Sequence, residues 1–169
     1  AGQRAFVTAF ARRFRGTSWI HWDLINEPSY APRSALWSTR PIGDATERQA
    51  FVAWIEHRHT ADVGALRALC HEPEGDPRAL PRPEDLSQAA VQAPRRPYKA
   101  RDFREFSDDV VARWAAGMRE DVRRAGGDVL VTLGQDEGGI FERPTQQRMA
   151  EALDYTSIHT WWKNDDLLW

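Results

Sequence analysis

The segment from Trp19 to Pro28 constrains the fold of this chain most strongly. It reads WIHWDLINEP, a short aromatic and β-branched run that favours a strand. Pro28 cannot continue a strand or a helix, so the strand has to end at Asn26 and Glu27. Apolar strands of this kind are typical of buried parallel sheets, whose carboxyl ends carry the chemistry in barrel and open α/β enzymes. We therefore expect Asn26 and Glu27 at a functional edge of a parallel sheet.

The same tripeptide, Asn26-Glu27-Pro28, also suits an ordinary turn. In that interpretation Asn and Pro fit the backbone and the Glu side chain is only solvated. The rest of the chain argues against it, because polar side chains recur where two later strands are expected to end.

Helices and strands are predicted to alternate along the chain. The apolar spacing predicts a helix that is already under way at Ala1 and is stopped by Gly16, and further helices over 102–125 and 144–153. Apolar runs predict strands over 19–27, 128–133 and 155–159. This alternation is typical of parallel βαβ units with right-handed crossovers. The predicted fold class is α/β, with parallel strands alternating with helices.

A long segment, 29–100, separates the first predicted strand from the next βα unit. Asp44 predicts the start of a helix that reaches His57, and Asp62 the start of a shorter one. Residues 72–97 are rich in proline and charge, which excludes regular structure. Asp102 is the predicted N-cap of the next helix.

The predicted strand ends carry a mixture of polar and aromatic side chains. These residues are Asn26 and Glu27, then Gln135, Asp136 and Glu137, and finally His159, Thr160, Trp161 and Trp162. The carboxyl ends of parallel strands share one rim, so we expect these side chains to converge. Sugar hydroxyls take directed hydrogen bonds from amides, carboxylates and imidazoles, and the apolar face of a pyranose packs on tryptophan.

The run WDLINEP resembles the fourth-strand signature of the clan A glycoside hydrolases. These (β/α)8 barrels include the cellulase-like family 5, the family 2 β-glycosidases and the family 42 β-galactosidases. The resemblance implies that Glu27 is the general acid/base and that Asn26 hydrogen-bonds the sugar 2-hydroxyl. The run DYTSIHTWW is similar to their sixth strand, where a His-x-Tyr pair borders the catalytic centre. By this motif the histidine is His159, and Trp161 stands where tyrosine is usual.

The resemblance implies a partial (β/α)8 barrel that holds about the fourth to sixth strands. Residues 1–169 are then expected to be a fragment of one catalytic barrel domain, with 29–100 as an insertion. Gln135, Asp136 and Trp162 join the predicted substrate-binding residues, and the substrate is an oligo- or polysaccharide or another β-glycoside.

Retaining hydrolysis requires two carboxyl groups roughly 5 to 5.5 Å apart. In the resembled enzymes the nucleophile follows the seventh strand, so we expect it outside this sequence. The alternative is a non-catalytic, carbohydrate-binding relative of these barrels, which keeps the amides and indoles without the nucleophile.

Composition argues against several other classes of function. The formal net charge is −2, which does not favour nucleic-acid binding, and the basic run 95–101 is expected to be a solvated surface. No apolar run approaches the roughly 20 residues that span a bilayer, so we expect a soluble, bacterial-type protein that is not embedded in a membrane. Its compartment, cytoplasmic or secreted, and its oligomeric state stay open.

Disulfide and metal sites are not expected either. Cys70 is the single cysteine, which excludes an internal disulfide. His57, His59, Cys70 and His71 lie close in sequence, but their spacing does not suit a zinc site. We expect neither a metal nor a cofactor.

Overall fold

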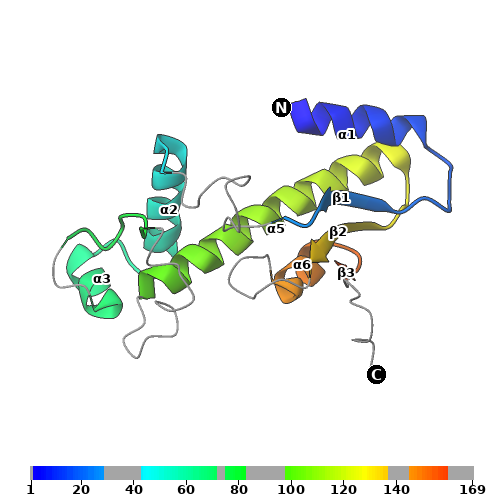
Figure 1. Cartoon of the computed structure of the whole chain (residues 1–169). Helices are drawn as coiled ribbons and strands as arrows, with labels where there is room; N and C mark the ends of the chain where they lie inside the picture. Colours follow the sequence, from blue (N-terminus) through cyan, green and yellow to red (C-terminus); the bar gives the residue numbers. More distant parts are fainter. Residues whose placement is uncertain (1, 29–42, 72–74, 83–97, 137–144, 160–169) are drawn as a thin grey trace, which may run out of the picture. The chain divides into compact units, whose positions relative to one another are not determined.

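The computed structural model describes residues 2–28, 43–71, 75–82, 98–136 and 145–159. Its elements follow in the order α1 (Gly2–Arg13), β1 (Trp22–Asn26), α2 (Ala45–Arg58), α3 (Val63–Cys70), α5 (Tyr98–Gly126), β2 (Val131–Asp136), α6 (Gln146–Ala152) and β3 (Ser157–His159) (Figure 1). The chain divides into two compact units. Unit 1 comprises 1–29 and 109–169, and unit 2 comprises 30–108, so α5 contributes residues to both.

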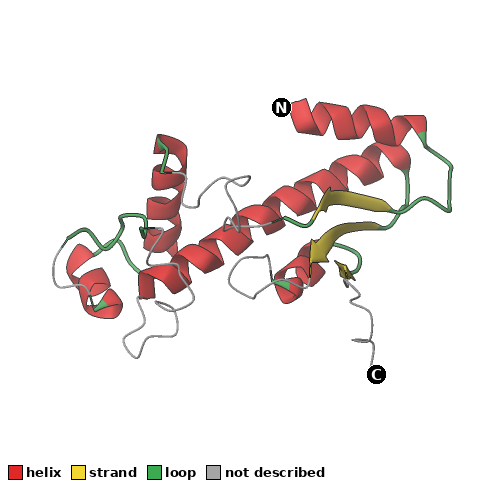
Figure 2. Ribbon diagram, in the orientation of Figure 1, coloured by secondary structure: helices red, strands yellow, loops and turns green. Residues whose placement is uncertain are grey.

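The sheet belongs to unit 1 and has the strand order β1-β2-β3 (Figure 2). Both strand pairs are parallel. Each pair is connected through at least one helix, α5 between β1 and β2 and α6 between β2 and β3. The predicted α/β alternation with parallel strands is therefore confirmed.

One face of the sheet packs against helices in the core of unit 1. Val131 and Leu133 of β2 are buried in this core, and Trp22 and Leu24 of β1 pack against it. The buried members are Ala11, Ala115, Val122, Ala125, Val131, Leu133, Met149 and Leu153. Trp114 of α5 also packs there.

A nearly buried carboxylate fixes the start of β2. Asp154 accepts a hydrogen bond from the backbone N–H of Val131 at 2.9 Å, and its own N–H donates to the Val131 carbonyl at 3.1 Å. Arg119 and Arg123 of α5 both donate to the Asp154 carboxylate, Arg123 at 2.8 Å. Asp154 therefore joins β2, α5 and the turn after α6.

Unit 2 has its own apolar cluster, formed by α2, α3 and the first part of α5. Its buried members are Phe51, Ile55, Leu66, Phe103 and Phe106, and Trp54 packs against them. Both predicted helix starts are confirmed: Asp44 accepts from the Glu47 N–H at 2.7 Å, and Asp62 accepts from the Ala65 N–H at 2.8 Å.

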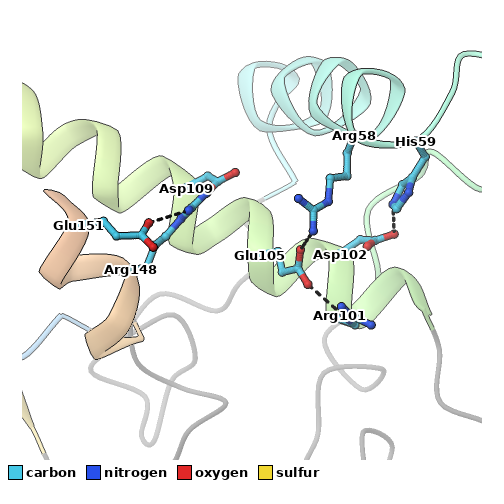
Figure 3. A network of polar contacts seen from close by, with 8 residues as sticks. All are labelled: Arg58, His59, Arg101, Asp102, Glu105, Asp109, Arg148 and Glu151. Atoms are coloured by element: carbon cyan, nitrogen blue, oxygen red, sulfur yellow. Dashed lines mark hydrogen bonds and ion pairs between the residues drawn. The ribbon is translucent and has the colours of Figure 1, made fainter.

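The predicted N-cap at Asp102 is wrong. Helix α5 begins at Tyr98, so Asp102 lies inside it, and its carboxylate contacts the Nε2 atom of His59 at 3.0 Å (Figure 3). Burial raises the pKa of Asp102, although His59 opposes the rise. The helix starts earlier because Lys99 and Ala100 are themselves buried, a tertiary contribution that a capping pattern does not contain.

Within the predicted irregular segment 72–97, the structure describes residues 75–82, which carry neither helix nor strand. Among the helices of the described ranges, none combines the length and apolarity needed to cross a bilayer.

Candidate active site

The candidate site begins at the carboxyl end of β1. Asn26, the last residue of β1, is exposed, and Glu27 follows it with a half-buried side chain. The backbone N–H of Glu27 donates to the carbonyl oxygen of Gly134 in β2 at 2.8 Å. Glu27 therefore stays attached to the sheet after the strand has ended.

Glu27 has an unusual backbone conformation. Its φ angle is 48°, in the left-handed region that residues other than glycine rarely adopt. Such conformations cost free energy, persist only where the surroundings impose them, and cluster at functional sites. The backbone at Glu27 is thus held by its neighbours.

Asp23 supplies one of these contacts. Its Oδ1 atom accepts a hydrogen bond from the N–H of Gly134 at 2.8 Å. Gly134 is therefore bonded through both of its backbone polar groups, to Asp23 and to Glu27. The sequence analysis did not include Asp23 in the site, although a carboxylate in the middle of an otherwise apolar strand was a usable signal.

Gln135 lies in β2 but is buried. Its exposed fraction is 2%, and side chains alternate along a strand, which places Gln135 on the same face as Val131 and Leu133. That face packs against the helices of unit 1. Gln135 is therefore better placed to support the end of β2 than to reach a ligand directly.

Asp136 and His159 are brought together at the level of the backbone. They are register partners where β2 and β3 end, and Gln135 pairs with Ile158 one residue earlier. The carboxyl ends of β2 and β3 thus lie at the same edge of the sheet, whereas the convergence of the side chains stays a prediction. Trp161, Trp162 and Glu137 lie outside the described residues.

Tyr155, just before β3, is a second residue that was not predicted to belong to the site. Its carbonyl accepts a hydrogen bond from the Thr132 hydroxyl at 2.8 Å, and its ring centroid lies 5.9 Å from that of His21. Burial raises the pKa of Tyr155, and the negative charges of Asp23 and Asp154 raise it further. The phenol therefore remains a neutral hydrogen-bond donor well into alkaline pH.

His59 and His71 of unit 2 have contacts of their own. His59 is paired with Asp102, and the ring of His71 lies 5.3 Å from that of Tyr98. In the part of the chain that the structure describes, no three His, Cys, Asp or Glu side chains are grouped as metal ligands.

The strand end at Asn26 and Glu27 combines two chemical capabilities. A half-buried carboxyl group can exchange a proton with a ligand oxygen, and an exposed amide next to it can donate to and accept from a hydroxyl group. The main chain that carries them is anchored to β2, so both groups start from a defined position.

Comparison with known sequences gives no match, either to a protein-family model or to a curated protein. Comparison with solved structures does. A β-galactosidase from the psychrophilic Marinomonas ef1 matches 94% of this chain with a TM-score of 0.66 and 17% identity, and the match covers 23% of that protein. A polyextremophilic β-galactosidase from the Antarctic haloarchaeon Halorubrum lacusprofundi matches 92% of this chain with a TM-score of 0.65 and 18% identity, over 22% of its length.

The chain thus spans less than a quarter of the length of these two enzymes. At such low identity the likeness concerns the backbone and not individual side chains. The three parallel strands and their helices therefore have the fold of a part of these β-galactosidases.

Proposed function

We propose that this chain is part of a retaining glycoside hydrolase, with Glu27 as the general acid/base. The observation that carries the proposal is the position of Glu27: a half-buried carboxyl group at the carboxyl end of a parallel strand, with its backbone bonded to the neighbouring strand. Two further findings support it, the strand-end motif Asn26-Glu27-Pro28 and the structural likeness to segments of β-galactosidases. The names of these enzymes make β-galactosides the first substrates to test.

In the proposed reaction Glu27 acts twice. It first protonates the glycosidic oxygen while a second carboxylate attacks the anomeric carbon, so that the leaving group departs and a glycosyl ester forms. It then removes a proton from the water molecule that attacks the same carbon and releases the carboxylate. We propose that this second carboxylate comes from another segment of the barrel.

The other predicted site residues are proposed to bind or support the substrate. Asn26, next to Glu27, is proposed to bind the sugar 2-hydroxyl, and Asp136 and His159 to bind hydroxyls from the ends of β2 and β3. Trp161 and Trp162 are proposed to pack on the apolar face of a sugar ring. Gln135 is proposed to support these groups from its buried position. Unit 2, residues 30–108, is proposed to be an insertion in the barrel domain.

The test is the turnover of aryl β-glycosides by the natural polypeptide that carries this sequence. Glu27→Gln keeps the shape of the side chain and removes its acid–base capacity, so kcat with a poor leaving group should fall about 10²- to 10⁴-fold. A highly activated leaving group needs no proton, so the rate of the first step should change little with such a substrate. Added azide should then attack the glycosyl–enzyme intermediate without base catalysis and restore turnover, with a glycosyl azide as the product.

Glu151→Gln is the matched control. Glu151 is an exposed residue of α6 in the same unit, paired with Arg148, and its replacement should leave kcat unchanged. Unchanged turnover in Glu27→Gln would exclude Glu27 as the acid/base. Saccharide binding by a polypeptide without turnover would favour the carbohydrate-binding alternative.

A further inference from the structure

The register between β1 and β2 changes just before Glu27. The N–H of Trp22 donates to the carbonyl of Leu130 at 2.9 Å. The two-residue spacing of a parallel ladder would then pair the N–H of Asn26 with the carbonyl of Gly134. In the structure the N–H of Glu27 makes that bond, one residue later.

A β-bulge accounts for this offset. Asp23 is the register partner of Thr132 and Asn26 that of Gly134, so β1 uses three steps where β2 uses two. A shift of one residue reverses the face of the sheet to which the following side chains are directed. The bulge therefore decides on which side of the sheet Asn26 and Glu27 emerge.

The carboxylate of Asp23 lies at this bulge. It accepts the N–H of Gly134 at 2.8 Å, while the carbonyl of Gly134 accepts the N–H of Glu27 at 2.8 Å. Gly134 of β2 is thus bonded to β1 through both its N–H and its carbonyl, on the two sides of the extra residue. Hydrogen bonds to an ionised acceptor are stronger than bonds between neutral groups, so the Asp23 side chain is suited to stabilise a locally disrupted ladder.

We propose that Asp23 is a positioning residue for Glu27. Through Gly134 it stabilises the bulge, and the bulge holds the Glu27 backbone at its left-handed φ angle of 48°. The catalytic consequence rests on the function proposed above, whereas the structural statement, that Asp23 fixes the conformation of Glu27, stands without it.

The structural statement is tested by NMR on the 169-residue chain. In the wild-type chain, a coupling transmitted through the hydrogen bond should connect the amide nitrogen of Gly134 with the carboxyl carbon of Asp23. In Asp23→Ala, hydrogen exchange of the Gly134 amide should accelerate about tenfold or more, and the three-bond HN–Hα coupling of Glu27 should move away from its wild-type value. Asp23→Asn retains an acceptor oxygen, so its Gly134 exchange rate and its Glu27 coupling should lie between those of the wild type and of Asp23→Ala.

Asp62→Ala is the matched control for loss of a carboxylate–amide bond. Asp62 accepts the N–H of Ala65 at the same distance, 2.8 Å, but in unit 2, so its removal should leave the Gly134 and Glu27 signals unchanged. The proposal is overturned if the wild-type coupling is absent, which can be established even if Asp23→Ala does not fold. Unchanged Gly134 exchange and Glu27 coupling in a folded Asp23→Ala chain would overturn it equally.

The catalytic consequence has a separate measurement. In the natural polypeptide, Asp23→Ala should lower kcat for an aryl β-glycoside about 10- to 100-fold with little change in KM, and Asp23→Asn should restore part of the loss. If Glu27→Gln leaves turnover unchanged, the proposed function fails while the NMR result still decides the role of Asp23. If Glu27→Gln abolishes turnover but Asp23→Ala does not lower kcat, the catalytic consequence of the positioning fails alone.

Discussion

Glu27 combines a reactive side chain with a backbone conformation that suits glycine better. Among the described residues other than glycine, Glu27 and His71 have positive φ angles, 48° and 53°. His71 ends α3 as its C-cap, a place where left-handed residues are common. Glu27 instead follows a strand, where the same conformation lowers the stability of the fold. Backbone strain of this kind is concentrated at functional sites.

The backbone cost at Glu27 can be measured by substitution. Glu27→Gly should be more stable than Glu27→Ala by about 1 kcal/mol, because glycine adopts positive φ without a steric penalty. At Asn26, within the strand, the order should reverse, and the alanine variant should be the more stable. Urea denaturation of the four variants gives both differences. A Glu27→Ala variant at least as stable as Glu27→Gly would show that the Glu27 backbone is not left-handed.

Asp154 is the residue on which the start of β2 depends. Its side chain is only 6% exposed and takes hydrogen bonds from two arginines and from the Val131 N–H. Asp154→Ala should therefore lower the free energy of unfolding by about 3 kcal/mol, since it removes the charged acceptor of the Val131 N–H and of two half-buried guanidinium groups. Asp128→Ala is the control, because that carboxylate is 99% exposed and 3.9 Å from Arg123, and it should leave stability unchanged.

The same carboxylate should make stability depend on pH. Burial raises the pKa of Asp154, but the hydrogen bonds from Arg119 and the Val131 N–H outweigh it, so the pKa lies below its ordinary value of 3.8. A lowered pKa contributes stability that is complete above the unfolded-state value and is lost as the pH falls through the folded-state value. As the pH falls below 3.8, the free energy of unfolding of the wild-type chain should therefore decrease more than that of Asp154→Asn. If the two free energies fall in parallel with pH, the pKa of Asp154 is not lowered in the folded state.

At the scale of elements, the caps at Asp44 and Asp62 and the order of elements follow from local sequence, whereas some boundaries do not. The second strand was predicted over 128–133 and is found at Val131–Asp136. Val129 and Leu130 have the same apolar character as the strand, and Leu130 is 43% exposed. At Val131 the N–H donates to the Asp154 carboxylate and the carbonyl accepts the Asp154 N–H, and these contacts hold the start of the strand.

The close approach of α1 and α5 can be tested with two glycines of α5. A Cβ atom added at Gly126 would lie 3.3 Å from the Ala11 carbonyl oxygen. A Cβ atom added at Gly117 would have no other atom within 4 Å. Gly117→Ala should stabilise unit 1 by about 0.5 to 1 kcal/mol through helix propensity. Gly126→Ala should be less stable than Gly117→Ala by about 1 kcal/mol, because α1 has to shift. Thermal or urea unfolding decides, and equal gains would show that the two helices are not in contact there.

At the scale of the whole molecule, the chain exposes several aromatic side chains. Phe6, Phe10 and Phe14 are 68%, 45% and 37% exposed on one side of α1 and its end, and Trp19 is 81% exposed. The rings of Phe6 and Phe10 stack with centroids 5.8 Å apart. β1 and β3 are also the edges of the described sheet. Exposed apolar groups and open strand edges both favour association.

We therefore expect the 169-residue chain to self-associate as its concentration rises. Phe6→Glu should shift sedimentation-velocity profiles towards the monomer, because it removes a phenylalanine that is 68% exposed and adds a charge. Ala5→Glu places the same charge on an exposed position of α1 without removing a ring, and it should have the smaller effect. Equal effects of the two variants would assign the change to charge rather than to the aromatic surface.

The sequence by itself determined the alternation of helices with parallel strands, two helix caps and the position of Asn26 and Glu27 at a strand end. Each depends on residues a few positions apart, such as Asp44 and Glu47. Only the tertiary structure decided the bulge in β1, the contact of Asp23, the burial of Gln135 and the true start of α5. Asp23 meets Gly134 from 111 residues away, and Asp102 meets His59 from 43, and local patterns contain no record of contacts over such separations.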